Sequence, residues 1–272
     1  MALLDLKNRF VAPANSELPI PPFEMRELVG PTDEADFDNP NGDLLFPDLP
    51  PEAYESVVDF GCGCGRVARR LMLQKPAPKR YVGVDLHKGI VDWCKKNLAP
   101  RVDGFDFIHH DVHNRGFNPK SKVIHRALPV ADASASLLIA WSVFTHITEQ
   151  SAEFYLREVA RVLKDGGVAS TTFFLFDKSE FPMMQEFQNA LYINEVDPTN
   201  AVIFDRNWLL EASTRSGLWI SRVVSPALYG FHWEIEFSPA HGGETHVEFP
   251  LDEAPRGKCP PPLAAAKAYK IR

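Results

Sequence analysis

A glycine-rich turn between an apolar strand and a helix constrains the fold of this chain more than any other feature. Residues 59–65 read DFGCGCG and place three glycines at alternate positions directly behind an apolar run. Glycines there let the backbone pass close to a ligand, and the free N–H groups at the start of the next helix can bind it. Because such turns lie at the carboxyl ends of strands in open α/β sheets, the motif predicts a ligand site at that edge.

The rest of the chain has the alternation of short apolar runs and amphipathic stretches that is typical of βαβ units. We expect strands at 57–60, 81–84, 105–108, 137–141 and 168–176, and helices at 66–74, 88–98 and 149–163. The last helix is expected to end at a glycine cap, residues 165–167. After an insertion at 177–204, we expect a helix from Asp205 to about 216 and strands at 218–224, 229–237 and 246–249.

Three carboxylates follow three successive strands. Asp59 precedes the glycines, where it would repel a pyrophosphate but suits a ligand with an ammonium group. Asp85 ends the second strand, twenty residues after Gly65, and an acid there accepts hydrogen bonds from ribose hydroxyls. Asp111 and the N–H of Val112 can bind the exocyclic amine and ring of adenine. Ammonium, ribose and adenine together describe S-adenosylmethionine.

These motifs resemble those of class I S-adenosylmethionine-dependent methyltransferases. Residues 57–66, 81–85 and 109–112 resemble the first three motifs, and 128–132, 142–147 and 158–167 the later core of bacterial small-molecule and sugar methyltransferases. The resemblance covers about residues 50–176 and implies an α/β, Rossmann-like fold with a mostly parallel seven-stranded sheet and helices on both faces. The implied cofactor contacts are Asp59, Gly61, Cys62, Gly63, Gly65, Asp85, Leu86, Asp111, Val112, Trp141 and Ser142.

The resemblance further implies an enzyme that transfers the methyl group of S-adenosyl-L-methionine to a small-molecule acceptor. We expect O-methylation of a saccharide or another hydroxylated metabolite, with N-methylation of an amine and a metal-assisted variant as alternatives. Trp141 stands where the family often has an acidic or aromatic residue, which removes one standard candidate base. His146 is the first candidate for a general base, and His232 and Glu234 are the second. Each of them could instead have a purely structural role.

Other interpretations of the same residues remain open. Residues 63–68 also satisfy G-x-G-x-x-A, the fingerprint of a nicotinamide- or flavin-dependent oxidoreductase, although Asp59 is badly placed for a pyrophosphate. A cofactor-binding protein without turnover would keep the same glycines and carboxylates. Cys62 and Cys64 lack two further ligands at suitable spacing, and the histidines at 109, 110 and 113 are expected at the rim of the cofactor, so we predict no metal site.

Composition narrows the class of protein and its partners. The chain has 272 residues and a net charge of −7 without clustered Lys or Arg, which argues against nucleic acid. It lacks the apolar run of roughly 18 residues that a membrane span needs, and its four cysteines favour the cytoplasm over a disulfide framework. We expect a Pro-rich wrap or lid at 1–50, the cofactor-binding domain at 51–250 and a tail at 251–272. The sequence leaves the oligomeric state open.

Overall fold

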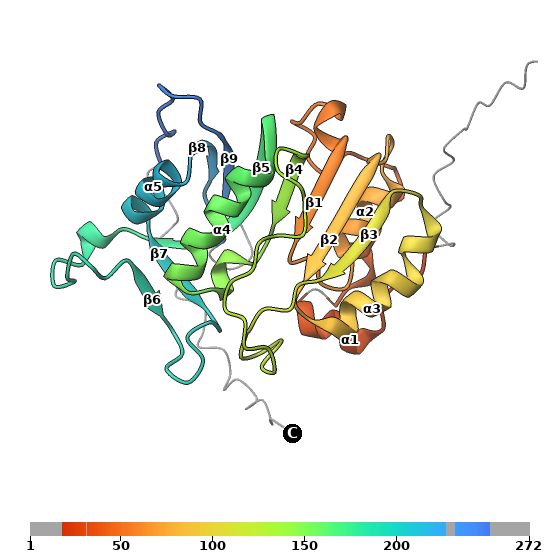
Figure 1. Ribbon diagram of the computed structural model, residues 1–272, viewed down its shortest axis with the longest axis horizontal. Helices are drawn as coiled ribbons and strands as arrows, with labels where there is room; N and C mark the ends of the chain where they lie inside the picture. Colours follow the sequence, from red (N-terminus) through yellow and green to blue (C-terminus); the bar gives the residue numbers. More distant parts are fainter. Residues whose placement is uncertain (1–17, 31, 227–231, 251–272) are drawn as a thin grey trace, which may run out of the picture.

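A computed structural model describes residues 18–30, 32–226 and 232–250. In these residues a nine-stranded sheet has the order β3-β2-β1-β4-β5-β7-β6, with β9 beside β5 and β8 beside β9 (Figure 1). The strands are β1 (Ser56–Phe60), β2 (Arg80–Asp85), β3 (Phe105–His109), β4 (Ala135–Ala140), β5 (Leu163–Phe176), β6 (Ala190–Tyr192), β7 (Val202–Asp205), β8 (Leu218–Val224) and β9 (His232–Pro239). The helices are α1 (Phe23–Val29), α2 (Arg66–Leu73), α3 (Lys88–Asn97), α4 (Glu149–Val162) and α5 (Arg206–Arg215).

Helices cover both faces of the sheet. Side chains alternate along a strand, so Val57 packs with α2 and α3 while its neighbour Val58 packs with α4 and α5. Leu137 and Leu138 of β4 divide in the same way. Strands that are buried on both faces need nearly continuous apolar runs, which is what β1 and β4 have. The predicted Rossmann-like α/β fold is therefore confirmed.

The sheet has two more strands than expected, because the insertion after β5 forms a hairpin. β5 is 14 residues long, and its outer edge holds two partners in turn. β9 runs antiparallel to residues 169–174, whereas β7 runs parallel to residues 174–176 and pairs with β6. No structure was predicted for the insertion at 177–204, so this hairpin was missed, because its strands are short and its loops are long.

Two local predictions are wrong. The helix α4 ends at Val162, and the glycines at 166 and 167 lie inside β5, where the register against β4 shifts. A Cβ on Gly167 would lie 2.9 Å from the Ala135 carbonyl oxygen, so this glycine serves a close approach of strands rather than a helix cap. Residues 246–249 form no strand: Val247 donates one backbone bond to Ile220, but the side chain of His246 accepts the return bond.

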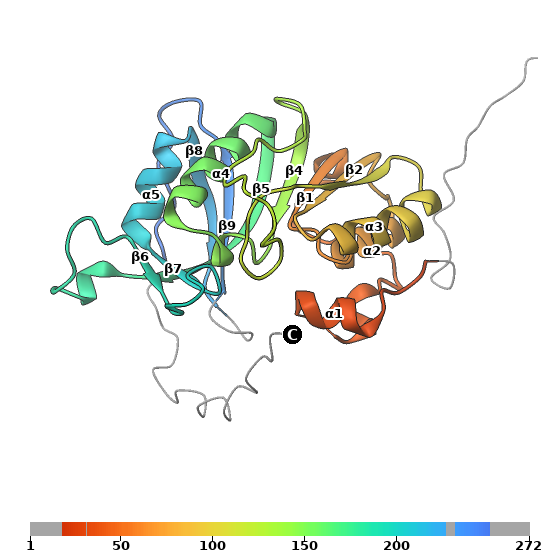
Figure 2. The ribbon, with the colours of Figure 1, turned by 60° about the horizontal axis from the view of Figure 1, so that its bottom comes forward.

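The fold places the expected ligand site at the carboxyl ends of the central parallel strands. β1 lies between β2 and β4, so the chain order reverses beside it, and ligands of doubly wound sheets bind at such a point. The arrowheads of β1–β3 point to this edge, the lower one in Figure 1. In both views α1 lies on the side of α2 and α3, and the β6–β7 hairpin lies on the side of α5 (Figure 2). Among the described residues, no helix is long and apolar enough to cross a membrane.

Candidate active site

The glycine-rich turn is held open by backbone geometry. Gly61, Gly63 and Gly65 have φ values of +82°, +50° and +85°, a region that side chains disfavour. A Cβ at Gly61 would lie 2.4 Å from Val143 Cγ2, and one at Gly65 would lie 2.6 Å from Leu98 Cδ1. Glycine is thus required here both by the conformation and by neighbouring side chains, and the turn forms a backbone cradle.

Asp59 lies beneath this cradle and is only 2% exposed. The Tyr81 hydroxyl donates a 2.7 Å hydrogen bond to its Oδ2 atom. Burial raises the pKa of Asp59 to about 7, although Tyr81 and the charge of Arg66 oppose the shift. An ammonium group placed here would favour the ionised form. Sequence reasoning missed Tyr81, although its place on the same face of β2 as Asp85 was a usable signal.

Asp85 connects the cradle to the start of α3. Its Oδ2 accepts from the Gly63 N–H at 2.9 Å, and its Oδ1 accepts from the His87 N–H at 2.8 Å. Burial raises the pKa of Asp85, and these two N–H groups oppose the shift. A carboxylate has about four acceptor positions, so both oxygens can still accept from ribose hydroxyls. The geometry therefore fits the sugar of an adenosyl cofactor.

The two predicted adenine contacts, Asp111 and Val112, already have hydrogen-bond partners within the protein. Asn118 donates to Asp111 Oδ1 at 3.0 Å, which lowers the pKa of Asp111. Val112 is buried, and its N–H already bonds to the His110 carbonyl at 2.7 Å. The Leu86 carbonyl accepts from the imidazole of the neighbouring histidine, residue 109, at 3.1 Å. Adenine binding by Asp111 and Val112 stays a prediction, and the N–H of Val112 would have to leave its present partner.

The three nearby histidines do not converge. His109 bonds to Leu86, His110 to Tyr155, and His113 to the Ser121 carbonyl. In the described ranges, no group of three His, Cys, Asp or Glu side chains could hold a metal ion. The cysteines at 62 and 64 are buried in two different apolar clusters, where they pack as small side chains.

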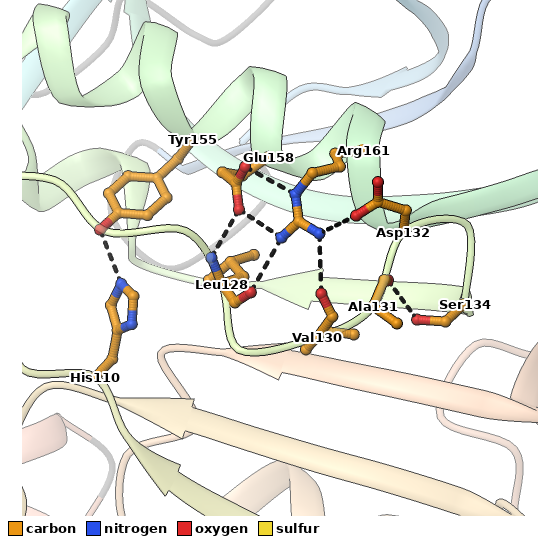
Figure 3. Close-up of polar contacts among 9 residues, drawn as sticks. All are labelled: His110, Leu128, Val130, Ala131, Asp132, Ser134, Tyr155, Glu158 and Arg161. Carbon is orange, nitrogen blue, oxygen red and sulfur yellow. Dashed lines mark hydrogen bonds and ion pairs between the residues drawn. The ribbon is translucent and has the colours of Figure 1, made fainter.

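A polar network fixes the chain that leads into β4 (Figure 3). Arg161 of α4 donates to the carbonyls of Leu128 and Val130 and pairs with Glu158, which accepts from the Leu128 N–H. Beside it, the buried His110 bonds to the Tyr155 hydroxyl at 3.0 Å, and burial lowers the pKa of this imidazole to about 4. The network ties the end of β3 and the start of β4 to one helix. Sequence reasoning assigned no role to Arg161.

The carboxyl end of β4 presents polar groups to β5 and β9. Ser142 has φ +56°, which is a strained conformation for serine and is typical of functional sites. Thr172 Oγ1 accepts from the Ser142 N–H at 2.7 Å, and the Ser142 hydroxyl lies 3.3 Å from His232 Nε2. Trp141 donates to the Ser170 hydroxyl. Glu234, which was predicted together with His232 as a second-choice base, is exposed. It lies two residues after His232 on β9 and pairs with Thr172 of β5.

His146 follows in a short helical turn and is half-buried. Its Nδ1 atom lies 3.3 Å from the Thr199 carbonyl in the insertion. Burial lowers the pKa of His146, and a charge on His232 lowers it further. His146 is consequently neutral at neutral pH and can accept a proton. The structure thus brings three predicted residues, Ser142, His146 and His232, to one end of the sheet.

The N-terminal segment packs on the cradle. A Cβ on Gly63 would lie 3.0 Å from Val29 Cγ1 of α1. Met25 and Val29 pack against a small cluster that includes Cys64 of the turn. Arg69 of α2 anchors the segment by donating to the Phe37 carbonyl at 2.6 Å. The described part of the predicted wrap or lid therefore contacts the proposed cofactor site directly.

One family of known proteins matches the core of this chain. Residues 57–167 match a family described as "Methyltransferase domain". This match favours S-adenosylmethionine over a nicotinamide dinucleotide as the cofactor.

Solved structures give more distant similarities. A chain of the complex between the Haloferax volcanii Trm112 methyltransferase activator and a methyltransferase is 19% identical, with 71% of this chain and 86% of that chain covered and a TM-score of 0.49. Human N-acetylserotonin methyltransferase in complex with S-adenosylmethionine is 16% identical. The match covers 70% of this chain and 49% of that chain, with a TM-score of 0.47. An S-adenosylmethionine-dependent methyltransferase from Mesorhizobium loti is 15% identical. The match covers 70% of this chain and 93% of that chain, with a TM-score of 0.47.

Proposed function

We propose that this chain, whose residues 57–167 match a methyltransferase domain, is a class I S-adenosylmethionine-dependent methyltransferase that methylates a hydroxyl oxygen of a saccharide or another small metabolite. The observation that carries the proposal is that two imidazoles and one hydroxyl lie at the same end of the sheet, beyond the carboxyl end of β4. Ser142 contacts His232 at 3.3 Å, and His146 lies in the short helical turn that follows β4. A hydroxyl acceptor must lose a proton during methyl transfer, and a neutral imidazole near neutral pH is the side chain best suited to take it.

At the cofactor end, the residues of this chain bind and orient. Asp59 would pair with the ammonium, Asp85 with the ribose hydroxyls and Asp111 with the adenine amine. When bound, the cofactor supplies a methyl group on a positively charged sulfur, which is already activated for transfer. The contribution of the protein is therefore mainly positioning and the exclusion of water.

At the acceptor end, His146 would take the hydroxyl proton while the acceptor oxygen attacks in line with the departing sulfur. The low pKa of this imidazole keeps it neutral and ready to accept a proton. His232 and Glu234 would bind other hydroxyls of the acceptor or share the proton, since both lie on the same face of β9. Ser142 would orient His232 through its hydroxyl.

The N-terminal segment would act as a lid in this scheme. Val29 of α1 packs directly against Gly63, so α1 would close one side of the cofactor site. Enclosure would exclude water during methyl transfer, which is the common purpose of lids.

The test is a methyl-transfer assay with S-adenosylmethionine and a panel of saccharides, hydroxylated aromatics and matching amines. We expect S-adenosylhomocysteine formation with a hydroxyl compound. His146→Gln should lower kcat by roughly 10²–10⁴-fold without changing cofactor affinity, while His113→Gln, an exposed histidine, should not. Turnover of amines alone would indicate N-methylation. Cofactor binding without turnover of any acceptor would indicate a binding protein and contradict the proposal.

A further inference from the structure

The loop between β6 and β7 reaches His146, although it belongs to an insertion with no role in the chemistry described above. Residues 193–201 connect these two strands. Within the loop, the Thr199 carbonyl lies 3.3 Å from His146 Nδ1. The same loop contacts the segment after β3, because Arg115 donates to the Val196 carbonyl. The loop therefore touches both the candidate base and the adenine end of the site.

We propose that Thr199 and Asn114 are positioning residues that hold His146 with its proton on Nδ1, so that Nε2 is the nitrogen that accepts the proton of the acceptor. This inference rests on the proposed function, in which His146 is the base. Thr199 acts through its main-chain carbonyl, and Asn114 acts by fixing Thr199.

The assignment of the proton follows from hydrogen-bond chemistry. A carbonyl oxygen can only accept, so the nitrogen that faces the Thr199 carbonyl must carry the hydrogen. In neutral imidazole one nitrogen donates and the other accepts, so Nε2 is left unprotonated. This is the less populated tautomer of a free histidine side chain. The loop thus selects the form in which Nε2 can serve as a base.

Thr199 is held in place by three further hydrogen bonds, made by its N–H group and its hydroxyl. Asp197 Oδ1 accepts from the Thr199 N–H at 3.2 Å and from its hydroxyl at 2.7 Å. Asn114 Nδ2 donates to that hydroxyl at 3.4 Å, while Asn114 Oδ1 accepts from the N–H groups of Gly116 and Phe117. Asn114 is therefore fixed by its own turn and fixes Thr199 in return.

The same turn extends to the predicted adenine contact. Asn114 and Asn118 pair through their backbones, and the Asn118 side chain donates to Asp111 Oδ1 at 3.0 Å. A continuous set of hydrogen bonds thus runs from Asp111 through this turn and Thr199 to His146.

The groups around His146 support a neutral imidazole. Burial lowers the pKa of His146, and the charge of His232 acts in the same direction. Hydrogen bonding to the backbone of Thr199 and Asn200 and the charge of Asp197 oppose this shift. If the loop loosens, the burial decreases and the pKa should rise toward the ordinary value of a histidine.

Imidazole nitrogen NMR on the ¹⁵N-labelled full chain tests the inference without an acceptor. The His146 signals are assigned by their loss in His146→Gln. We expect the Nδ1–H tautomer in the wild type and in Thr199→Ser, which keeps the hydroxyl. Thr199→Val, which has nearly the same shape, should give a mixture of tautomers and a higher pKa. An Nε2–H tautomer in the wild type, or an unchanged tautomer and pKa in Thr199→Val, would overturn the inference.

Kinetics separate this inference from the proposed function. With any acceptor that turns over, Thr199→Val should lower kcat about tenfold, the size of losing the one hydrogen bond that orients His146, without changing the Kd of S-adenosylhomocysteine. The effect should disappear in the His146→Gln background, because Thr199 acts through His146. Wild-type turnover by His146→Gln would overturn the proposed base, even if the NMR tautomer is as expected. An impaired His146→Gln with normal Thr199→Val turnover would overturn the positioning role alone.

Discussion

The replacement Asp59→Asn separates two effects of the buried carboxylate: it destabilises the ligand-free fold, and it would bind the ammonium group of the cofactor. Asp59 is 2% exposed and receives one hydrogen bond from Tyr81, which asparagine can also accept through its side-chain oxygen. The variant therefore keeps the shape and this contact but removes the charge. We expect the ligand-free protein to become more stable at alkaline pH, while S-adenosylhomocysteine binds at least tenfold more weakly because the ammonium loses its charged partner.

The magnitude follows from the pKa. Burial raises the pKa of Asp59 from an ordinary 3.8 to about 7, a shift of about three units. At about 1.4 kcal/mol per unit, the ionised carboxylate costs up to about 4 kcal/mol in the folded state. Local relaxation and water penetration reduce such penalties, so we expect a gain of about 2 kcal/mol for the variant at pH 8.

The sign of the pH dependence is fixed by the direction of the shift. The unfolded chain releases the Asp59 proton near pH 3.8, whereas the folded chain holds it until about pH 7. The wild type therefore loses stability relative to the variant as the pH rises from about 4 to about 7, and the difference is constant above that range. At pH 4 the two proteins should have nearly equal free energies of unfolding.

Urea unfolding of the ligand-free proteins at pH 4, 6 and 8 measures this difference. Asp106→Asn on β3 is the matched control, because this aspartate is exposed. An Asp59→Asn protein that is less stable than the wild type at pH 8, or a difference that does not change with pH, would refute the reasoning.

Three further variants test the cradle, the strained serine and the buried histidine. Gly61→Ala should abolish detectable S-adenosylhomocysteine binding by calorimetry, because the new Cβ would lie 2.4 Å from Val143 Cγ2; normal affinity would show that the cradle tolerates a side chain. Ser142→Gly should raise the free energy of unfolding by about 1 kcal/mol through relief of backbone strain, and no gain would mean that the conformation is unstrained. Tyr155→Phe should lower it by about 1–3 kcal/mol, since His110 loses its partner; an unchanged urea midpoint would contradict that role.

The core of the fold was predictable from local patterns. β1, α2, β2 and α3 begin and end within two residues of the predicted positions, because apolar runs and the glycine turn mark them in the sequence. The cap of α5 was equally visible, since the Asp205 side chain accepts from the Trp208 N–H as expected. These features depend on residues that are close together in the chain.

The errors concern contacts between distant segments. The glycines after α4 resemble a helix cap, but a strand register against Ala135 decides their role. The β6–β7 hairpin exists because the long β5 offers a free edge, which no local pattern reveals. Tyr81 and Thr199 were missed for the same reason: each acts on a residue that lies far away in the sequence.

The measurement that tests the central claim most directly is isothermal titration of the purified protein with S-adenosylhomocysteine, with NADH as the control ligand. We predict micromolar binding of S-adenosylhomocysteine and none of NADH. Asp85→Asn should weaken the binding about tenfold or more, because this carboxylate holds the cradle and would face the ribose. Binding of NADH alone, or S-adenosylhomocysteine binding that is unaffected by Asp85→Asn, would contradict the assignment of this edge of the sheet as the cofactor site.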